Sequence, residues 1–283
     1  MLDTSSIPDA PPEELRFSRS SSVFGALREL WGRRELIRTL TTRDFIARYK
    51  QTLLGVGWSV IQPLAVVLAL SLFLRRIAKA DTHGVPYVLW SFVGLIPWSF
   101  FSGAVTAGVN SLLNNQPLLN KVRCPREAFP FAAVLLVGID TAISVMTLGV
   151  VFAVTASAPA ITIYWIPVIL LVQIPAALGA ATLASIVVVY LRDLRNVLPL
   201  LLQLGLFVTP IAFALDQVPP RFRLLYCFVN PVAPVIDSYR RVVLYGIAPQ
   251  PGPLLAGALS GILLFLIGVK VFKRLELGIA DLI

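Results

Sequence analysis

The stretch RDFIARYKQTLLGVGWSVIQPL, residues 43–64, decides the fold of this chain. Its first half is amphipathic and carries four charged residues, namely Arg43, Asp44, Arg48 and Lys50. Gly55 and Gly57 follow, and the sequence then continues through Trp58 into a long apolar segment. Basic side chains lie well at anionic lipid headgroups while apolar neighbours enter the acyl boundary. The stretch therefore predicts an interfacial helix followed by the point where the chain enters a membrane.

The composition is that of a membrane protein. Hydrophobic residues make up 57% of the 283 residues and charged residues only 14%, so we expect an all-α integral membrane protein. The net charge of +9 does not indicate nucleic-acid binding, because no basic run alternates with aromatic residues in a water-exposed segment. No Gly-Lys pair occurs, which excludes a Walker A loop for ATP. We expect no cofactor and no metal in this chain.

Six apolar stretches are long enough to cross a bilayer as helices. They cover residues 56–74, 88–109, 129–154, 161–191, 197–215 and 254–272. The fourth is over-long and contains Pro167 and Pro175, so we expect it to be tilted or kinked. Residues 1–29 read as a disordered cytoplasmic tail, and residues 30–283 as one transmembrane domain.

The distribution of Lys and Arg predicts the orientation of the spans. With the N-terminus inside, most of the 24 Lys and Arg residues fall on the cytoplasmic side. We therefore expect both termini in the cytoplasm. Arg75 and Arg76 fall outside, where their side chains can snorkel to the interface. Cys124 and Cys227 fall on opposite sides of the bilayer and are expected to be packing residues.

Two connecting segments are unusual. Residues 111–127 are cytoplasmic, and their leucines indicate a short surface helix able to dock into a partner's groove. Residues 216–252 are external, too polar to span and too apolar for a free loop. Prolines break this segment into pieces that predict short re-entrant helices. Irregular backbone at membrane depth is tolerated only where it is buried in protein or lines a cavity. We therefore expect a pathway beneath this external segment.

Asp140 is an isolated acid in the third span. An ionisable residue inside a membrane is a functional hypothesis by default. Three interpretations remain open: a buried structural hydrogen bond or helix partner, a polar contact lining a pathway, and ion coupling.

Aromatic residues gather toward the outer end of the second span: Tyr87, Trp90, Phe92, Trp98, Phe100 and Phe101. One interpretation is an aromatic belt at the membrane interface. The other is a set of ring faces along which a sugar polymer slides, because aromatic rings offer contact area without fixing a hydroxyl pattern.

Several short motifs are shared with one family of membrane proteins. They are Arg43-Asp44, Arg48-Tyr49-Lys50, Leu54-Gly55, Trp58, Gly94-Leu95, Phe100-Phe101-Ser102, Pro125-Arg126, Asp140, Arg192-Asp193, Asn230-Pro231 and Tyr239-Arg240. On these motifs the chain resembles the permease subunits of type-2 ABC transporters that export polysaccharides, the Wzm-like group handling O antigens, capsules, teichoic acids and galactan. Arg123 and Cys124 depart from the family, which usually has two aromatic residues there.

The resemblance implies a homodimer of six-span permeases in the bacterial plasma (inner) membrane, joined to two copies of a separate ATP-binding subunit that holds ATP and Mg. It implies that a polysaccharide linked to polyprenyl pyrophosphate crosses the channel. An amphipathic helix at residues 30–50 and the loop at 111–127 would contact the ATPase through Arg43, Asp44, Arg48, Leu113, Asn115, Lys121 and Arg126. The external segment would form gate helices that include Tyr226, Phe228, Asn230, Pro231, Tyr239 and Arg240.

As a hypothesis, Arg43, Arg48 and Lys50 also attract the pyrophosphate, because clustered cations favour a dianionic headgroup. Anchoring to anionic lipids is the alternative role for the same residues. Two other functions remain as alternatives. A polyprenyl-phosphate-dependent membrane glycosyltransferase would need acids in the outer loops, where only Asp81, Asp216 and Asp237 are available. The other is the permease of a small-molecule ABC exporter.

Overall fold

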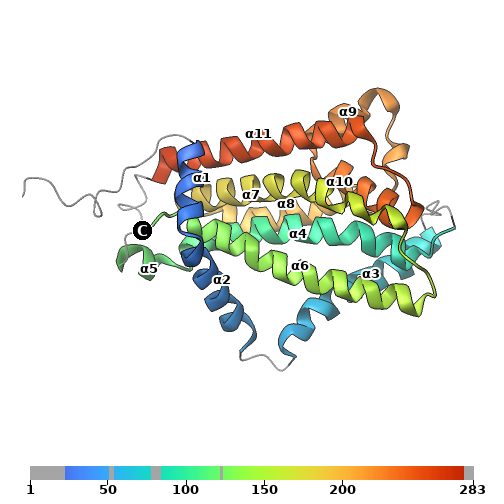
Figure 1. Ribbon diagram of the computed structural model, residues 1–283, viewed down its shortest axis with the longest axis horizontal. Helices are drawn as coiled ribbons and strands as arrows, with labels where there is room; N and C mark the ends of the chain where they lie inside the picture. Colours follow the sequence, from blue (N-terminus) through green and yellow to red (C-terminus); the bar gives the residue numbers. More distant parts are fainter. Residues whose placement is uncertain (1–22, 51–53, 78–83, 122–123, 277–283) are drawn as a thin grey trace, which may run out of the picture.

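The computed structural model describes residues 23–50, 54–77, 84–121 and 124–276, and contains no strand among them. The long helices lie side by side (Figure 1). One end of the bundle carries α1, α5 and the end of α11, and is called the α5 end; the other carries α9 and α10, and is called the α9 end. The expectation of an all-α membrane protein agrees with this architecture. Residues 1–22 of the expected tail lie outside the described residues.

The predicted interface helix is two helices. α1 (Val23–Gly32) begins within the segment expected to be disordered, and α2 (Arg34–Tyr49) follows after a break at Arg33, whose φ and ψ are −110° and 27°. Glycine disfavours helix interiors, so Gly32 is a natural end point for α1. Both helices cross the α5 end of the bundle instead of running along it (Figure 1).

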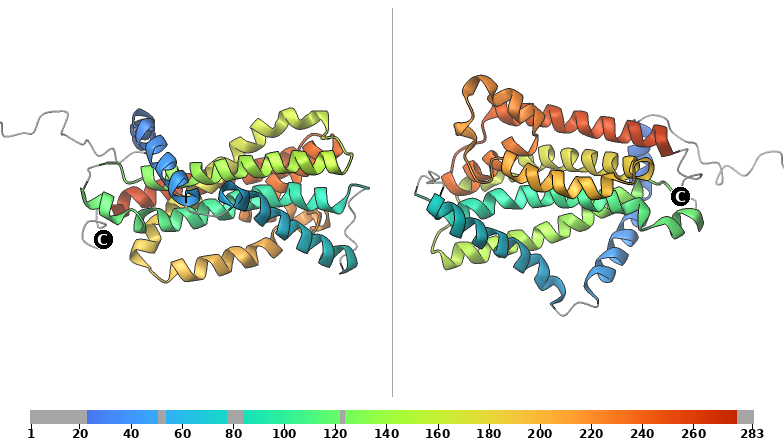
Figure 2. Two further views of the ribbon diagram at one scale, coloured as in Figure 1. Left: turned by 90° about the horizontal axis from the view of Figure 1, so that it is seen from below. Right: turned by 180° about the vertical axis from the view of Figure 1, so that it is seen from behind.

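The bundle is built around one central helix. Its long helices are α3 (Trp58–Ile77), α4 (Tyr87–Leu113), α6 (Ala128–Val154), α7 (Ile166–Tyr190), α8 (Leu194–Val208) and α11 (Pro251–Leu275). α4 packs against α6, α7, α3 and α8, while α11 covers the other side of α7 (Figures 1 and 2). A predominantly apolar helix that neighbours surround on several sides is buried in a bundle core, and α4 is buried along most of its length.

Four helices are long and apolar enough to cross a membrane within the described part of the chain: α4, α6, α7 with its preceding turn η4 (Ile161–Trp165), and α11. These match the second, third, fourth and sixth expected spans. The first and fifth expected spans correspond to shorter apolar helices, residues 58–69 of α3 and the whole of α8. Pro167 lies in the first turn of α7 and Pro175 in its interior.

The fifth span is shorter than predicted for a local reason. α8 ends at Val208, where Thr209 adopts an extended conformation with φ −85° and ψ 145°. Proline disfavours the helical region for the residue before it, and Pro210 follows directly. The apolar run to residue 215 therefore continues as a turn instead of a helix.

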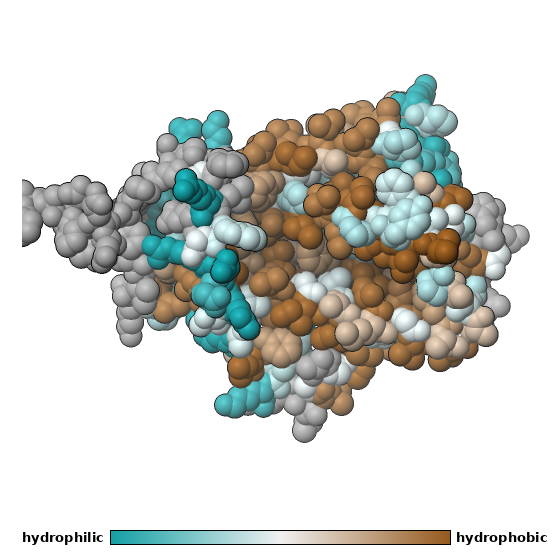
Figure 3. All heavy atoms as spheres, viewed as in Figure 1, coloured by the Kyte–Doolittle hydropathy of each residue, from teal (hydrophilic) through white to brown (hydrophobic). Residues whose placement is uncertain are grey.

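The outer surface of the long helices is apolar. Met146 and Val150 of α6, Leu171 of α7 and Leu259 of α11 are more than half exposed. Figure 3 shows hydrophobic residues over the middle of one face, with hydrophilic residues gathered toward its two ends. This is the pattern that a lipid bilayer selects.

Close backbone contact joins α7 to α11. A Cβ added at Gly179 would lie 2.5 Å from the backbone N of Phe265, and one added at Gly268 would lie 2.5 Å from the Gly179 carbonyl oxygen. Only glycine fits at such an approach, and small residues are the usual means of packing helices within membranes.

Short elements connect the long ones. At the α5 end the connecting element is α5 (Gln116–Lys121), in the expected coupling loop. η3 (Gly55–Gly57) precedes α3 at the point of the V that α2 and α3 form beside the bundle (Figure 1). At the α9 end they are η5 (Leu215–Gln217), α9 (Pro220–Val229), α10 (Val232–Arg240) and a π-helical turn η6 (Arg241–Tyr245). α9 packs on α11, and α10 packs on α4, α7 and α11. The prediction of short helices in residues 216–252 agrees with these elements.

Candidate functional site

A polar cavity of about 1350 Å³ lies beside α4. Residues of α2, α3, α4, α6 and α8 line it. α2 and α3 approach one another as the arms of a V beside the bundle, and they form the outer wall (Figure 1). A cavity with polar walls among apolar helices is the arrangement expected of a passage for a hydrated substrate.

The inner wall of the cavity is polar because of the spacing of small residues. Ser99, Ser102, Thr106 and Asn110 recur every three or four residues along α4, so they share one face of the helix. Thr141 and Ser144 face the same cavity from α6. Our sequence reading missed this stripe, and the four-residue spacing of polar residues within an apolar span was the signal for it.

Asp140 joins three helices at the cavity wall. Its carboxylate accepts hydrogen bonds from Arg48 Nη1 at 2.5 Å and from the Tyr49 hydroxyl at 2.5 Å, both from the end of α2. Ser59 of α3 lies 3.4 Å from the same carboxylate and 2.6 Å from the Tyr49 hydroxyl. Asp140 is therefore a helix partner, as the first of the open interpretations has it, and it also lines the cavity.

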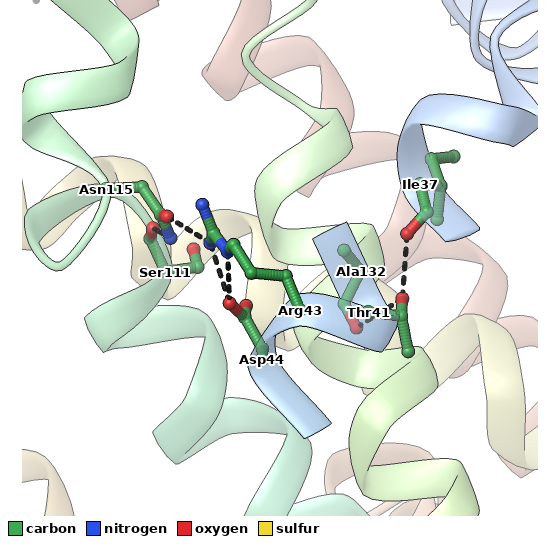
Figure 4. A network of polar contacts seen from close by, with 7 residues as sticks. All are labelled: Ile37, Thr41, Arg43, Asp44, Ser111, Asn115 and Ala132. Atoms are coloured by element: carbon green, nitrogen blue, oxygen red, sulfur yellow. Dashed lines mark hydrogen bonds and ion pairs between the residues drawn. The ribbon is translucent and has the colours of Figure 1, made fainter. Parts of the chain in front are cut away.

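A second network ties α2 to the end of α4 (Figure 4). Arg43 donates to Asp44 through Nε at 2.9 Å and through Nη2 at 2.6 Å, and its Nη2 also donates to Asn115 Oδ1 at 2.5 Å. Thr41 donates to the Ile37 carbonyl at 2.8 Å and lies 3.3 Å from the Ala132 carbonyl of α6. The middle of α2 is thus attached to both α4 and α6.

The other expected interface residues have varied surroundings. Leu113 is half-buried and packs against the cluster formed by α4 and α7 residues Val105, Val109, Ala184 and Val188. Lys50 is exposed at the end of α2. Lys121 ends α5, and its side chain lies outside the described part. Arg126 donates to the Glu276 carbonyl at 2.5 Å, beyond the end of α11.

A buried carboxylate supports that junction. Glu127 is 1% exposed and forms an ion pair with Lys273, which also lies 3.6 Å from Glu276. Burial, together with the nearby charge of Glu127, raises the pKa of Glu276. The cluster binds the start of α6 to the end of α11, so the loop at 111–127 is held against the last described residues.

The aromatic residues of α4 lie mainly in the protein interior. Trp90, Phe92, Trp98 and Phe100 are all less than a tenth exposed. Trp98 lines the cavity, and Phe101 lies 6.1 Å from it between ring centroids. Tyr87 is half-buried, 5.7 Å from Trp90 between ring centroids. Phe92 packs in the apolar core, and the Trp90 ring lies against the guanidinium of Arg240, so both are buried within the bundle around α4.

The expected gate residues hold α9 and α10 to the bundle. The Tyr226 hydroxyl donates to the Val208 carbonyl at 2.6 Å, and Asn230 Nδ2 donates to Thr209 Oγ1 at 2.9 Å. The Tyr239 hydroxyl donates to Gln173 Oε1 of α7 at 3.1 Å. Pro231 is buried, and Phe228 is exposed.

Arg240 is the most constrained of these residues. It is 3% exposed and donates to the carbonyls of Trp90, Pro210, Ile211 and Phe213 at 2.7–3.3 Å. Its guanidinium carbon lies 3.4 Å from the Trp90 ring centroid. Burial lowers the pKa of Arg240 to about 9, so the group still carries its charge at neutral pH.

The charge distribution in the cavity was only partly predictable. Arg43, Arg48, Asp44 and Arg195 line it together with Asp140. Arg195 lies in the first turn of α8 and is exposed. Sequence reasoning assigned no role to Arg195, Tyr49 or Ser59, because nothing local indicates that they face the same space as Asp140.

Helices long and apolar enough to cross a membrane, grouped around a polar cavity, are typical of the class of membrane transport proteins. The ABC-2 type transporter family model matches residues 35–244, and the chain belongs to this family. Its relatives include the O-antigen export system permease protein RfbA of Klebsiella pneumoniae, 26% identical over 88% of this chain and 95% of the relative. RfbA of Myxococcus xanthus is 27% identical over 87% and 95%. The polysialic acid transport protein KpsM of Escherichia coli is 23% identical over 85% and 93%. The resemblance proposed from the motifs is confirmed.

Proposed function

We propose that this chain is the channel-forming permease subunit of an ABC transporter that exports a lipid-linked polysaccharide across the plasma membrane. The polymer is carried on polyprenyl pyrophosphate, and a separate subunit supplies the energy by hydrolysing ATP with Mg. The observation that carries the proposal is the polar cavity between apolar helices. The names of the relatives support a polysaccharide as the substrate.

The working unit is a homodimer with two copies of the ATP-binding subunit. α3 and α8 complete the six spans of each permease, with both termini in the cytoplasm and the α9 end outside. The exposed apolar residues of α8, among them Leu200, Leu204 and Phe207, suit a membrane or a second copy of the chain.

The partner ATPase binds at the α5 end, through α2 and the loop that contains α5. Arg43, Asp44 and Asn115 form a connected network there, which suits them to transmit a rigid-body movement to the helices. Arg43 and Arg48 already have acidic partners in this structure, so in attracting a pyrophosphate they exchange those partners. Lys50 attracts the same group.

Depletion of the protein in its native cell tests the proposal. The polyprenyl-linked lipids are extracted and their glycans analysed, together with the polysaccharide at the cell surface. We expect a long lipid-linked polymer to accumulate inside while the surface polysaccharide falls. Accumulation of short intermediates would instead indicate a role in synthesis, and unchanged levels of both pools would reject the proposal.

A further inference from the structure

The side chains that line the cavity indicate what kind of polymer it accepts. Several hydroxyl groups face it from α4 and α6, and each already donates its proton to a carbonyl of its own helix. The distances are 2.8 Å for Thr106 to Ser102, 2.8 Å for Thr141 to Val137, 3.1 Å for Ser144 to Asp140 and 3.4 Å for Ser102 to Ser99. A hydroxyl has one proton and two lone pairs. Toward the cavity these groups therefore present acceptor oxygens.

The charges of the cavity are nearly balanced within the chain. Arg43 is paired with Asp44, and Arg48 is paired with Asp140. Arg195 is the one lining cation whose side chain has no hydrogen bond or ion pair with the described residues. In this structure the cavity thus offers one positive charge without an acidic partner, beside a wall that combines the acceptor oxygens of these hydroxyls with the amides of Gln62, Asn110 and Asn114. An anion that drew Arg43 or Arg48 away would leave Asp44 or Asp140 without its cation.

Neutral and anionic polymers meet this wall differently. A sugar hydroxyl can donate a hydrogen bond to each acceptor oxygen, whereas a carboxylate is only an acceptor. A polymer with a negative charge on every residue would need one cation per residue, and desolvating an unmatched charge is costly. It would also approach the carboxylate of Asp140.

We propose that the cavity selects an uncharged, polyhydroxylated chain, a neutral glycan, over a polyanionic one. This inference rests on the proposed export of a polysaccharide and narrows its substrate class. Trp58 and Trp98 line the same cavity and supply flat faces for the apolar sides of sugar rings. The selectivity follows first from the charge balance, because a single cation without an acidic partner cannot match an anion on every sugar. The hydrogen bonds within α4 and α6 add to it, because they consume the hydroxyl protons.

The test measures binding of two probes to the full chain in nanodiscs. Maltoheptaose is the neutral probe and a sialic acid heptamer is the anionic one, and tryptophan fluorescence reports binding because Trp58 and Trp98 line the cavity. We expect the anionic probe to bind at least about tenfold more weakly, as one unmatched charge would cause. Equal or tighter binding of the sialic acid heptamer, or binding of neither probe, would overturn the inference.

Three variants sharpen the result. Thr106→Val keeps the shape but removes an acceptor oxygen, so binding of maltoheptaose weakens. Asp140→Asn releases Arg48 from its acidic partner, so binding of the sialic acid heptamer strengthens. Ser185→Ala is the matched control, because Ser185 makes the same kind of hydrogen bond within α7, to Thr182 at 2.7 Å, and does not line the cavity.

Failure of this inference differs from failure of the proposed function. If depletion in cells removes a surface polyanion and the anionic probe binds more tightly, export stands and the neutral-glycan selectivity is wrong. If depletion leaves every surface polysaccharide unchanged, the proposed function itself fails.

Discussion

Replacing Arg240 with alanine should destabilise the protein more than any other single arginine replacement at the α9 end. The side chain joins three segments that are distant in sequence: α10, the turn after α8, and the first half of α4. Its removal leaves carbonyl acceptors at Trp90, Pro210 and Ile211 without their donor in a site that water does not reach.

The size of the effect follows from the geometry. Two of the four hydrogen bonds, to Pro210 and Ile211, are 2.7 Å long, and those to Phe213 and Trp90 are 3.2 and 3.3 Å. A hydrogen bond to a charged group contributes about 1.5–3 kcal/mol, and a desolvated cation–π contact about 2 kcal/mol. The cost of burying the guanidinium offsets much of this sum. We expect a net loss of about 3–5 kcal/mol on truncation, as for other broken buried charge networks.

Thermal unfolding of the purified protein, followed by tryptophan fluorescence, measures this loss. A destabilisation of that size lowers the unfolding temperature by about 6–15 °C in a chain of this length. Arg221→Ala is the matched control, because Arg221 is exposed and its contact with the Phe222 ring is longer, at 4.4 Å. If the Arg240 and Arg221 variants unfold within about 1 °C of each other, Arg240 does not stabilise the contact between α10, α4 and the turn after α8.

Three further outcomes are expected. Asp140→Asn should keep ATP hydrolysis by the assembled transporter while reducing export severalfold, as assayed in proteoliposomes; equal loss of both activities would contradict this. Gly179→Ala should destabilise the protein by about 1–3 kcal/mol through the α7–α11 contact, whereas Gly149→Ala, with nothing within 4 Å, should not when both are compared by thermal unfolding. Burial raises the pKa of Cys227 to about 12, so its thiolate fraction at pH 7 is on the order of 10⁻⁵. Because maleimide reacts with the thiolate, it should label the half-buried Cys124 long before Cys227, as measured by mass spectrometry.

Hydropathy predicted which segments form long helices, but it did not predict which helices pack against one another. The stretches in α4, α6, α7 and α11 were all recognisable, because about 20 apolar residues are required to cross a bilayer. Which faces meet lipid and which meet protein was not, since both environments are apolar and the same residues suit either. The aromatic residues of α4 illustrate this: their composition is compatible with an interfacial belt, but Trp90 and Phe92 are 1% and 0% exposed.

The polar site was predictable only in part. Asp140 was conspicuous as an acid in an apolar stretch, yet its partner Arg48 is 92 residues away in sequence, and no local pattern connects the two. The end of α8 could be predicted more easily from the sequence, because Thr209-Pro210 is a local signal that a helix ends. Short-range rules act within a few residues, whereas the cavity is made by contacts between elements far apart in the chain.

The two polar networks of α2 connect the proposed ATPase interface to the cavity. Arg43 contacts the end of α4 through Asn115, and Arg48 contacts the interior of α6 through Asp140. The two arginines are five residues apart on one continuous helix, a rise of about 7.5 Å, so they move together. A displacement of the loop next to Asn115 would therefore change the Arg48–Asp140 contact at the cavity wall. Under the proposed function, this ion pair would couple movement of the ATPase partner to the shape of the cavity. For this reason neutralising Asp140 should separate ATP hydrolysis from export instead of abolishing both.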